Sequence, residues 1–305
     1  MKTFLPKFVW FDGKFVKDNE ANVSVMTHAI HYGTSVFEGI RGYWNSKNLN
    51  IFRLDDHIKR FRNSGKVYSI SLQYTDKQIT DAILGLCRKN NVTESCYIRP
   101  FYFVGRYGIN LHITEKSPTH AAVVMFPFGD LFNKNGISAG ISSWRRIHDT
   151  STPPLAKMGG NYLNSILATQ ECKRNGYDEA ILLDQIGNIS EAPGENIFII
   201  RDEKLLTPPT TSSALEGITK NSVIEIAKNL GYVTVEREIS RTEVYFSDEI
   251  FLTGTAAEVT PIISIDGKKV GSGKTGKITQ QIRQSYSEIT MGRNKKYSRW
   301  ITPVY

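Results

Sequence analysis

The sequence has 305 residues, in which 38 Lys and Arg outnumber 30 Asp and Glu to give a formal net charge of +8. This length predicts two domains or one large one, with enough apolar residues for a sizeable core. The 40% hydrophobic content and the 24 glycines are typical of a globular protein and argue against disorder, collagen and coiled coil. Three scattered cysteines are too few for a disulfide framework or a structural zinc site, so we expect a reducing, cytoplasmic location.

The positive charge could indicate nucleic-acid binding, but the basic residues are mixed with acidic ones along most of the chain. The one dense basic stretch, residues 293–299, is accompanied by no known nucleic-acid-binding module, which favours a solvated surface. Residues 1–7 do not resemble an export signal, because Pro6 and Lys7 interrupt the apolar run. The apolar stretch 121–128 is far shorter than the roughly 20 residues of a membrane span. We therefore expect neither a nucleic-acid nor a membrane partner, and a small anionic ligand instead.

The first part of the chain alternates predicted strands and helices. Residues 8–16 predict a β-hairpin that turns at residues 12–14 (DGK). Apolar residues at helical spacing predict helices at 54–67 and 76–89, and dense β-branched and aromatic residues predict strands at 97–104 and 121–126. We assign residues 1–127 to a small N-terminal domain and the polar, Gly-containing residues 128–137 to an interdomain linker.

The second part repeats this mixture of elements. It predicts helices at 160–173 and 221–230, with Gly231 as a left-handed C-cap, and buried strands at 179–183 and 196–200. We assign residues 138–305 to a larger second domain. The fold class is α/β (α+β), with two mixed domains and a cleft between them.

Three patterns suggest chemistry that the surrounding sequence does not support. Residues 271–276 (GSGKTG) resemble a P-loop, but Lys268 stands where the first glycine is required, which favours a hairpin loop. His28 and His31 are three residues apart, but neither a carboxylate nor His57 joins them in an obvious metal-binding motif, so we expect no metal site. His148 precedes an aspartate, but no nucleophile motif accompanies the pair.

Two loops in the second part are suited to binding an anion. Residues 207–220 are rich in hydroxyl groups and lead into the helix at 221–230, whose N-terminus offers backbone N–H groups to a phosphate. Residues 253–258 (TGTAAE) follow a predicted strand, and their small side chains let a ligand approach the backbone. Taken singly, each is also explained by an ordinary N-cap loop or a tight turn. Together, without a Rossmann fingerprint, they indicate a phosphate-bearing cofactor other than a dinucleotide.

Lys157 and Glu191 are candidates for the chemistry of such a cofactor. Lys157 lies among small and apolar neighbours, where desolvation favours a neutral amine that can form a Schiff base; the alternative is a surface lysine. Glu191 lies just before the strand at 196–200 and could keep a pyridine nitrogen protonated; the alternative is a turn residue.

Several short motifs, in this order along the chain, give the sequence a family likeness. AK at 156–157 with GNY at 160–162, SE at 190–191 with GEN at 194–196, Leu215 with GIT at 217–219, and GTAAE at 254–258 together resemble the fold-type IV pyridoxal-phosphate enzymes. Within that group, YGTSVFEGIR at 32–41 and YIRP at 97–100 resemble the branched-chain amino-acid aminotransferases. The likeness extends from about Val9 to about Gly271.

The resemblance implies a small N-terminal α/β domain, a larger C-terminal pseudo-barrel domain that binds pyridoxal 5′-phosphate, and a homodimer or higher oligomer. Lys157 would be the catalytic residue, forming a Schiff base with the cofactor, and Glu191 would pair with the ring nitrogen. Tyr162 would contact the ring hydroxyl. The implied cofactor-binding residues are Arg60, Lys157, Tyr162, Glu191, Leu215, Ile218, Thr219 and Thr255. Among them, Arg60, Ile218, Thr219 and Thr255 would bind the phosphate.

The implied reaction is ping-pong transamination between L-leucine, L-isoleucine or L-valine and 2-oxoglutarate, which gives L-glutamate. The implied substrate-binding residues are Tyr32, Phe37, Gly39, Tyr97, Arg99, Ala256 and Ala257. Arg99 would bind the distal carboxylate of glutamate, and the loop at 105–111, or Tyr97, would shield Arg99 when leucine is bound. The alternatives are a D-amino-acid aminotransferase or an aminodeoxychorismate lyase of the same fold, or a non-catalytic protein that binds anions or nucleic acid.

Three residues depart from the pattern of many relatives. Leu131 replaces a tyrosine of the interdomain loop, Glu216 replaces a proline, and Lys220 replaces an arginine. We expect these changes to affect the shape of the substrate pocket and to leave the catalytic core intact.

Overall fold

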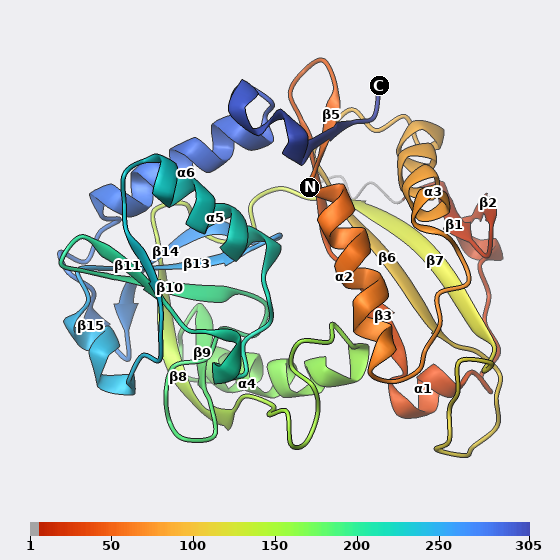
Figure 1. Ribbon diagram of the computed structural model, residues 1–305, viewed down its shortest axis with the longest axis horizontal. Helices are drawn as coiled ribbons and strands as arrows, with labels where there is room; N and C mark the ends of the chain where they lie inside the picture. Colours follow the sequence, from red (N-terminus) through yellow and green to blue (C-terminus); the bar gives the residue numbers. More distant parts are fainter. Residues whose placement is uncertain (1–5) are drawn as a thin grey trace. The chain divides into compact units, whose positions relative to one another are not determined.

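The computed structural model describes residues 6–305 (Figure 1), so most of the segment 1–7 that we examined for an export signal lies outside the described residues. The chain divides into two compact units. Among the described residues, the N-terminal unit comprises residues 6–129, 156–160 and 289–305, and the C-terminal unit comprises residues 130–155 and 161–288. Within residues 6–305, no helix has the length and apolar character needed to cross a membrane.

These units differ from the predicted domains at two places. Residues 156–160, which contain Lys157, and residues 289–305 belong to the N-terminal unit, although the predicted limits assign them to the second domain. The two units are consequently similar in length. The division into a small domain, a linker at 128–137 and a large domain stays a prediction.

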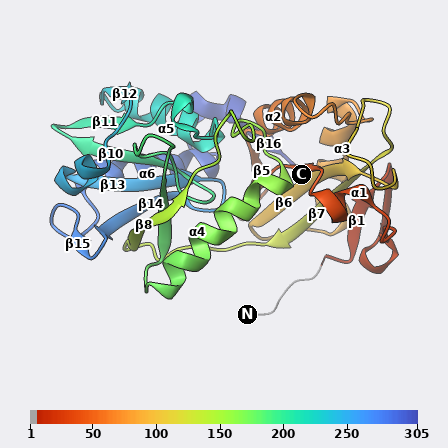
Figure 2. The ribbon, with the colours of Figure 1, turned by 90° about the horizontal axis from the view of Figure 1, so that it is seen from below.

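The N-terminal unit is an antiparallel sheet with two long helices over one face (Figures 1 and 2). Its strand order is β16-β5-β4-β6-β7-β1-β2, and β3 pairs with β6. The strands are β1 (Phe8–Phe11), β2 (Lys14–Lys17), β3 (Ser35–Phe37), β4 (Ile40–Trp44), β5 (Leu49–Phe52), β6 (Cys96–Val104), β7 (Thr119–Pro127) and β16 (Ile301–Pro303). The helices are α1 (His28–Tyr32), α2 (Leu54–Lys66) and α3 (Asp76–Lys89).

The predicted elements of this unit are confirmed. The β1–β2 hairpin turns at Asp12–Gly13, where both residues have positive φ, as a two-residue turn of this kind requires. The apolar faces of α2 and α3, including Phe61 and Ile83, form one core with the sheet residues Ile98 and Val123. Burial of these faces fixes the orientation of α2, and therefore of the polar residues on its other faces.

The C-terminal unit contains a mixed sheet of order β12-β11-β10-β13-β14-β8-β9, with β15 paired to β14. Its strands are β8 (Ile137–Arg145), β9 (Glu179–Leu183), β10 (Asn196–Arg201), β11 (Lys204–Thr207), β12 (Thr234–Glu236), β13 (Glu249–Gly254), β14 (Glu258–Ile265) and β15 (Lys268–Lys269). Its helices are α4 (Tyr162–Arg174), α5 (Ile218–Asn229) and α6 (Lys277–Thr290), whose last two residues belong to the N-terminal unit.

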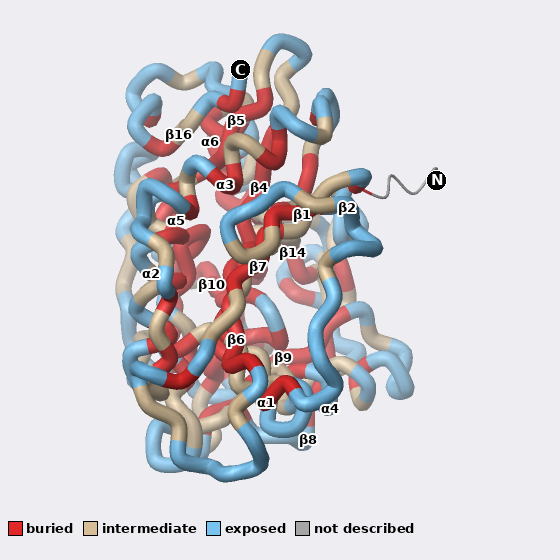
Figure 3. The backbone as a smooth tube through the Cα atoms, turned by 90° about the vertical axis from the view of Figure 1, so that its right-hand side faces the viewer, coloured by how far each residue is buried: buried red, intermediate tan, exposed pale blue. Residues whose placement is uncertain are grey.

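Most of the predicted elements of this unit are also confirmed. The helices expected at 160–173 and 221–230 are α4 and α5, and Gly231 has a φ of +88° after the end of α5. Helix α4 packs on β8 and β9 (Figure 2), and α5 packs on β13. Buried residues are concentrated along the sheets of both units, as the red segments of β6, β7 and β10 show in Figure 3.

The prediction of a hairpin loop for residues 271–276 is wrong in position. The hairpin turns at Asp266–Gly267, between β14 and β15, and residues 271–276 lead into α6, a helix that we did not predict. The Glu249 carboxylate accepts hydrogen bonds from the N–H groups of Ile278 and Thr279 at the start of that helix. These backbone donors therefore already have an anionic partner from the protein itself.

Candidate active site

The predicted site residues fall into two groups, one in each unit. The N-terminal unit contains Tyr32, Phe37, Gly39, Arg60, Tyr97, Arg99 and Lys157. The C-terminal unit contains Tyr162, Glu191, Leu215, Ile218, Thr219, Thr255, Ala256 and Ala257.

Lys157 is held by its backbone between α2 and β3. Its N–H donates a 3.0 Å hydrogen bond to the Ser64 hydroxyl, and its carbonyl accepts a 3.1 Å bond from the N–H of Phe37. The neighbours Ala156 and Met158 are buried in the core of the unit. The Lys157 ammonium lies 5.0 Å from the centre of the Phe37 ring. Lys157 is therefore a half-buried residue in a fixed segment, unlike a mobile surface lysine.

Arg60 lies one helical turn after His57 on α2, and both contact the Glu38 carboxylate, which is completely buried. The Arg60 Nε and Nη2 atoms donate to Glu38 at 2.6 and 2.8 Å, and Nδ1 of His57 lies 2.7 Å from Oε2. Burial by itself would raise the pKa of the Glu38 carboxyl. Arg60, together with His57, nevertheless holds this pKa well below its usual range. Burial lowers the pKa of His57, against the opposing effect of Glu38. The cluster thus combines an ionised carboxylate, a guanidinium and a neutral imidazole.

Arg99 and Tyr97, both on β6, lie beside Phe37. The Arg99 guanidinium is 4.4 Å from the centre of the Phe37 ring, and its Nη2 donates a 3.1 Å hydrogen bond to the Tyr97 hydroxyl. A Cβ atom on Gly39 would lie 1.9 Å from that hydroxyl oxygen, so only glycine leaves room for the tyrosine. The structure therefore brings Phe37, Gly39, Tyr97 and Arg99 together, and their role as a substrate pocket stays a prediction.

Tyr32 belongs to a different cluster of the same unit. Its hydroxyl donates to the Ile109 carbonyl at 3.0 Å, and the buried His28 connects the hydroxyl of Thr34 with the carbonyl of Asn110. These contacts anchor the loop at 105–111 to α1. At the tip of this loop the Ile109 side chain is 75% exposed. Whether this loop shields Arg99 stays a prediction.

In the C-terminal unit, Glu191 is buried, and its two carboxylate oxygens are held separately. Oε1 accepts from Arg146 Nε at 2.8 Å, while Oε2 accepts from Asn196 Nδ2 at 3.1 Å and from the Leu215 N–H at 3.0 Å. Arg146 follows β8, and Asn196 begins β10, so two strands fix one carboxylate. This is far more support than a turn residue receives, and the contact with Arg146 is a charge-assisted hydrogen bond.

The N-terminus of α5 lies next to this network. Gly217 is its N-cap and contributes no side-chain hydrogen bond, and Ile218 and Thr219, in the first turn, are buried. A Cβ atom on Gly217 would lie 1.8 Å from the side-chain oxygen of Asn196. The absence of a side-chain cap leaves the positive end of the helix dipole suited to an anion.

The turn Thr255–Ala257 joins β13 to β14 beside the same network, because Asn196 of β10 pairs with Thr253 of β13. The hydroxyl groups of Ser190, Ser212 and Thr253 are buried and have no hydrogen-bond partner within residues 6–305. Buried hydroxyls usually find partners, so this part of the unit is suited to a polar ligand.

Tyr162 is the first residue of α4, and that helix is tied to the same region. The Ser165 hydroxyl donates to the Pro193 carbonyl at 2.8 Å, close to the guanidinium of Arg146. Of the three departures, Leu131 lines a small pocket with Ala256 and Ala257. Lys220 is buried and donates to the Pro208 carbonyl and to Glu236, which is a structural role.

Sequence reasoning missed the residues that hold the predicted ones in place: Glu38, His57, Ser64, Arg146 and Asn196. Glu38 and Asn196 stood within the motifs that we used but received no role. The helical spacing of His57 and Arg60 was a usable signal for a shared partner. Arg146 had no such signal, since we did not recognise β8.

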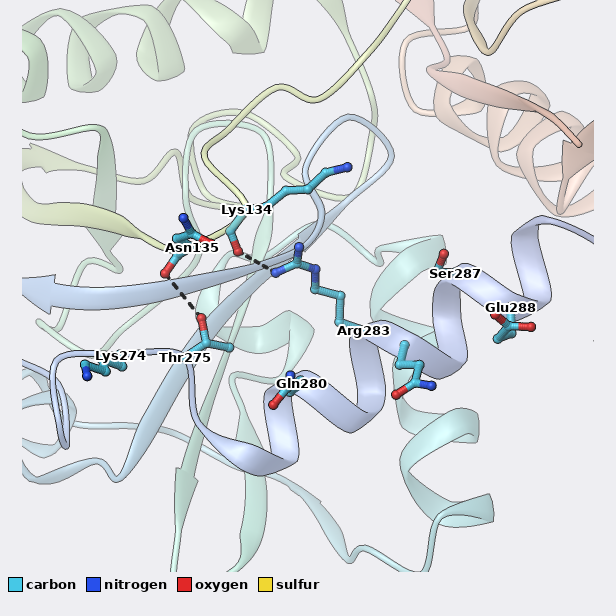
Figure 4. Close-up of a pocket in the computed structure, with 9 residues that line it drawn as sticks. Lys134, Asn135, Lys274, Thr275, Gln280, Arg283, Ser287 and Glu288 are labelled. Carbon is cyan, nitrogen blue, oxygen red and sulfur yellow. Dashed lines mark hydrogen bonds between the residues drawn. The ribbon is translucent and has the colours of Figure 1, made fainter.

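A separate groove of about 650 Å³ lies on the C-terminal unit (Figure 4). Lys134, Lys274, Arg283 and Glu288 are its charged lining residues, and Arg283 donates to the carbonyl of Lys134. None of the predicted site residues lines this groove. Within residues 6–305, moreover, no group of three or more His, Cys, Asp or Glu side chains could hold a metal ion.

Known proteins resemble this chain over its full length. Residues 35–265 match the family described as amino-transferase class IV. The branched-chain-amino-acid aminotransferases of Salmonella typhimurium and Escherichia coli are both 42% identical to it, over 100% of this chain and 99% of theirs. The solved branched-chain aminotransferase from Thermoproteus uzoniensis, with norvaline, has 44% identity and a TM-score of 0.95 over 98% of this chain and 99% of its own. The branched-chain amino acid aminotransferase from Thermobaculum terrenum, solved in its PLP-form, has 38% identity and a TM-score of 0.93 over 99% of each chain.

Proposed function

Because this chain belongs to the class IV aminotransferase family, we propose that it exchanges amino groups between branched-chain L-amino acids and 2-oxoglutarate, with pyridoxal phosphate as its cofactor. The full-length similarity to enzymes named for this activity supports the proposal. The observation that carries it is that Lys157 and Arg99 lie against the same Phe37 ring, at 5.0 and 4.4 Å. An amine for the cofactor, an apolar wall and a cation for a carboxylate are thus adjacent.

The residues present fit pyridoxal phosphate. The start of α5, without a side-chain cap, suits a phosphate, and the buried Glu191 carboxylate suits a ring nitrogen that must remain protonated. Buried hydroxyls without partners lie in the same unit. We assign the phosphate to Arg60, Ile218, Thr219 and Thr255, the ring nitrogen to Glu191, the ring hydroxyl to Tyr162 and the aldehyde carbon to Lys157. When bound, the cofactor supplies an electron sink that lets the substrate Cα lose its proton.

The chain's own residues then perform two tasks. Lys157 Nζ would take the proton from the substrate Cα and deliver it to the former aldehyde carbon of the cofactor, which requires an amine in a fixed position. The contacts of its backbone to Ser64 and Phe37 provide that position. Glu191, held in place by Arg146, would stabilise the positive charge on the ring nitrogen throughout the reaction.

Two kinds of substrate must use one pocket. The Phe37 ring offers an apolar surface to a branched side chain, and Arg99 offers its N–H groups to the distal carboxylate of glutamate. A half-buried guanidinium without a partner is unfavourable, and the Tyr97 hydroxyl accepts a hydrogen bond from it. Tyr97 can therefore satisfy one N–H group of Arg99 while leucine is bound, whereas the Nε of Arg99 is buried without a hydrogen-bond partner within residues 6–305. We assign the α-carboxylate to the backbone N–H groups of Ala256 and Ala257.

Steady-state assays test the proposed activity. Purified protein supplied with pyridoxal phosphate should form L-glutamate from L-leucine and 2-oxoglutarate, and should leave D-alanine unchanged. Turnover of D-alanine alone would identify a D-amino-acid aminotransferase instead. Release of pyruvate from aminodeoxychorismate, without transamination, would identify a lyase. Either result contradicts the proposal.

We also propose that the protein is a cytoplasmic homodimer. Leu163, Ile166 and Leu167 of α4 are 68, 49 and 39% exposed and share one face of the helix. An exposed apolar stripe of this kind is typical of a surface that contacts another protein. Cys87, Cys96 and Cys172 are free and buried, which is consistent with a reducing location.

A further inference from the structure

Glu38 is the most deeply buried carboxylate of the N-terminal unit that the proposed reaction does not use. It lies in the short connection between β3 and β4, is 0% exposed, and receives hydrogen bonds from Arg60 and His57. Its own N–H donates to the Pro100 carbonyl at 2.9 Å, so its backbone is fixed to β6. Burying a charge is unfavourable unless the charge is paired, so a completely buried carboxylate calls for an explanation.

The main effect of the contacts that Glu38 makes is on the orientation of the Arg60 guanidinium, rather than on the charge of the guanidinium. Nε and Nη2 of Arg60 bind the two different oxygens of the carboxylate, at 2.6 and 2.8 Å. Such a two-point contact fixes both the position and the plane of a guanidinium, which a single hydrogen bond does not. Nδ1 of His57 donates to Oε2 at 2.7 Å and so restricts rotation of the carboxylate itself.

Neighbouring residues show why this orientation matters for the site. Phe37 and Gly39, on either side of Glu38, contact Arg99 or leave room for Tyr97. Because successive side chains of an extended segment point to opposite faces, Glu38 is directed to α2 while its neighbours are directed to the pocket. One short connection therefore fixes the positions of the substrate-pocket groups and of the phosphate-binding arginine relative to one another.

We infer that Glu38, supported by His57, is a positioning residue that holds the Arg60 guanidinium in the orientation in which it binds the cofactor phosphate. The inference rests on the proposed function, since it takes Arg60 as a phosphate ligand. The inference also predicts in which direction the affinity for the phosphate changes when Glu38 is replaced. A carboxylate beside Arg60 repels a phosphate, so on charge alone its removal should tighten phosphate binding, whereas loss of orientation should weaken it.

Binding of pyridoxal phosphate and of pyridoxal, which lacks the phosphate, to cofactor-free protein separates these two effects. In Glu38→Gln one acceptor oxygen becomes an amide group, which cannot accept from Arg60 or His57. We expect the Kd for pyridoxal phosphate, measured by fluorescence titration, to rise at least tenfold. The Kd for pyridoxal should remain within twofold, because this ligand does not need Arg60.

Three controls separate positioning from a general structural role. Glu38→Gln should add no further loss of phosphate-dependent affinity in an Arg60→Ala background. Glu243→Gln removes another buried carboxylate held by two arginines, in the C-terminal unit, and should leave both affinities unchanged. His57→Leu should weaken pyridoxal phosphate binding, while His57→Asn, which keeps a donor near the Nδ1 position, should restore it. The histidine pair also tests the inference if Glu38→Gln does not fold.

Each result of these binding experiments either supports or overturns the inference about Glu38. Binding of pyridoxal phosphate by Glu38→Gln that is unchanged or tighter would overturn the inference while leaving the proposed function intact. An equal loss in the Arg60→Ala background, or equal losses for pyridoxal and its phosphate, would overturn it as well. If the wild-type protein binds neither compound, the proposed function fails, and the inference fails with it.

Discussion

At the scale of single residues, the site is organised by cations with closely defined partners. Arg99 lies over the Phe37 ring, its Nη2 donates to the Tyr97 hydroxyl, and its Nε is buried without a hydrogen-bond partner within residues 6–305. Under the proposed function, the distal carboxylate of glutamate would accept from these groups, and Tyr97 would keep Nη2 paired when leucine is bound. We therefore expect the two half-reactions to differ in their dependence on Arg99.

Replacement of Arg99 by leucine should therefore affect the two substrates unequally. We expect kcat/KM for 2-oxoglutarate to fall about 100-fold, since losing one partner of a buried charge pair costs about 2–5 kcal/mol. The value for L-leucine should change less than tenfold. Separate half-reaction kinetics measure both quantities. Tyr97→Phe, which keeps the ring and the arginine, is the matched control and should lower neither value more than about tenfold; equal losses for the two substrates in Arg99→Leu would contradict this account.

Arg146 and Glu191 form a second pair at the residue scale. Arg146→Met leaves Glu191 buried without its cation, and breaking a buried pair on one side costs about 3–5 kcal/mol. The urea midpoint of the cofactor-free protein should fall accordingly. The double variant Arg146→Met/Glu191→Gln removes both charges and should recover part of the loss. A midpoint for Arg146→Met equal to that of the wild type would show that the pair carries no such energy.

At the scale of elements, α2 is braced by the C-terminal segment of the chain. Arg53, its N-cap, has a φ of +53° and donates its N–H to the Trp300 carbonyl at 2.7 Å. The guanidinium of Arg53 lies 4.7 Å from the centre of the Trp300 ring, and Trp300 is buried. A residue held at positive φ persists where its surroundings fix it. The C-terminal segment thus supports the helix that presents His57 and Arg60.

Trp300→Ala should therefore loosen the first turn of α2. We expect faster hydrogen exchange at residues 54–60 and unchanged exchange in α3, because removing a buried tryptophan also removes the contacts that hold Arg53. Mass spectrometry of peptides from the two helices measures this difference. Trp44→Ala, which removes a ring that packs on Tyr305, is the control and should leave residues 54–60 protected. Uniform loss of protection in both helices would contradict a local brace.

The elements predicted well from the sequence are those with local signals. Helix α3 has the predicted bounds, and Thr75 and Gln78 form a capping box at its start. Helix α6 lacks such a local cap, because Glu249, far away in the sequence, binds its first N–H groups. Strand β8 contains Gly140 and several serines and pairs in parallel with β9 and β14, which are poor local signals. Long-range partners therefore account for the missed elements.

At the scale of the whole molecule, contacts between residues far apart in the sequence also determine the position of Lys157. The motifs predicted its chemistry, but the hydrogen bonds that join it to Phe37 and Ser64 connect residues about a hundred positions apart. No local pattern announces that residues 156–160 return to the N-terminal unit. The family likeness predicted individual site residues such as Glu191, and the structure added the residues that hold them.

Self-association is a further prediction for the whole molecule. Light scattering coupled to gel filtration should give twice the 34.4 kDa mass of one chain. Leu163→Glu/Ile166→Glu should shift the protein to the mass of one chain, because charge on the exposed face of α4 opposes its burial. Ile186→Glu changes an exposed apolar residue of a turn outside α4 and should leave the dimer intact. A wild-type protein with the mass of one chain would contradict the proposed homodimer.

The central claim is that Lys157 and its neighbours transfer an amino group from a branched-chain L-amino acid. A single turnover without acceptor tests it most directly, with the protein loaded with pyridoxal phosphate and the 2-oxo acid quantified by mass spectrometry. We predict that L-leucine yields up to one equivalent of 4-methyl-2-oxopentanoate per chain, that 2-oxoglutarate then yields L-glutamate, and that Lys157→Ala yields neither. No 2-oxo acid from L-leucine, or 2-oxo acid from D-alanine alone, would contradict the account.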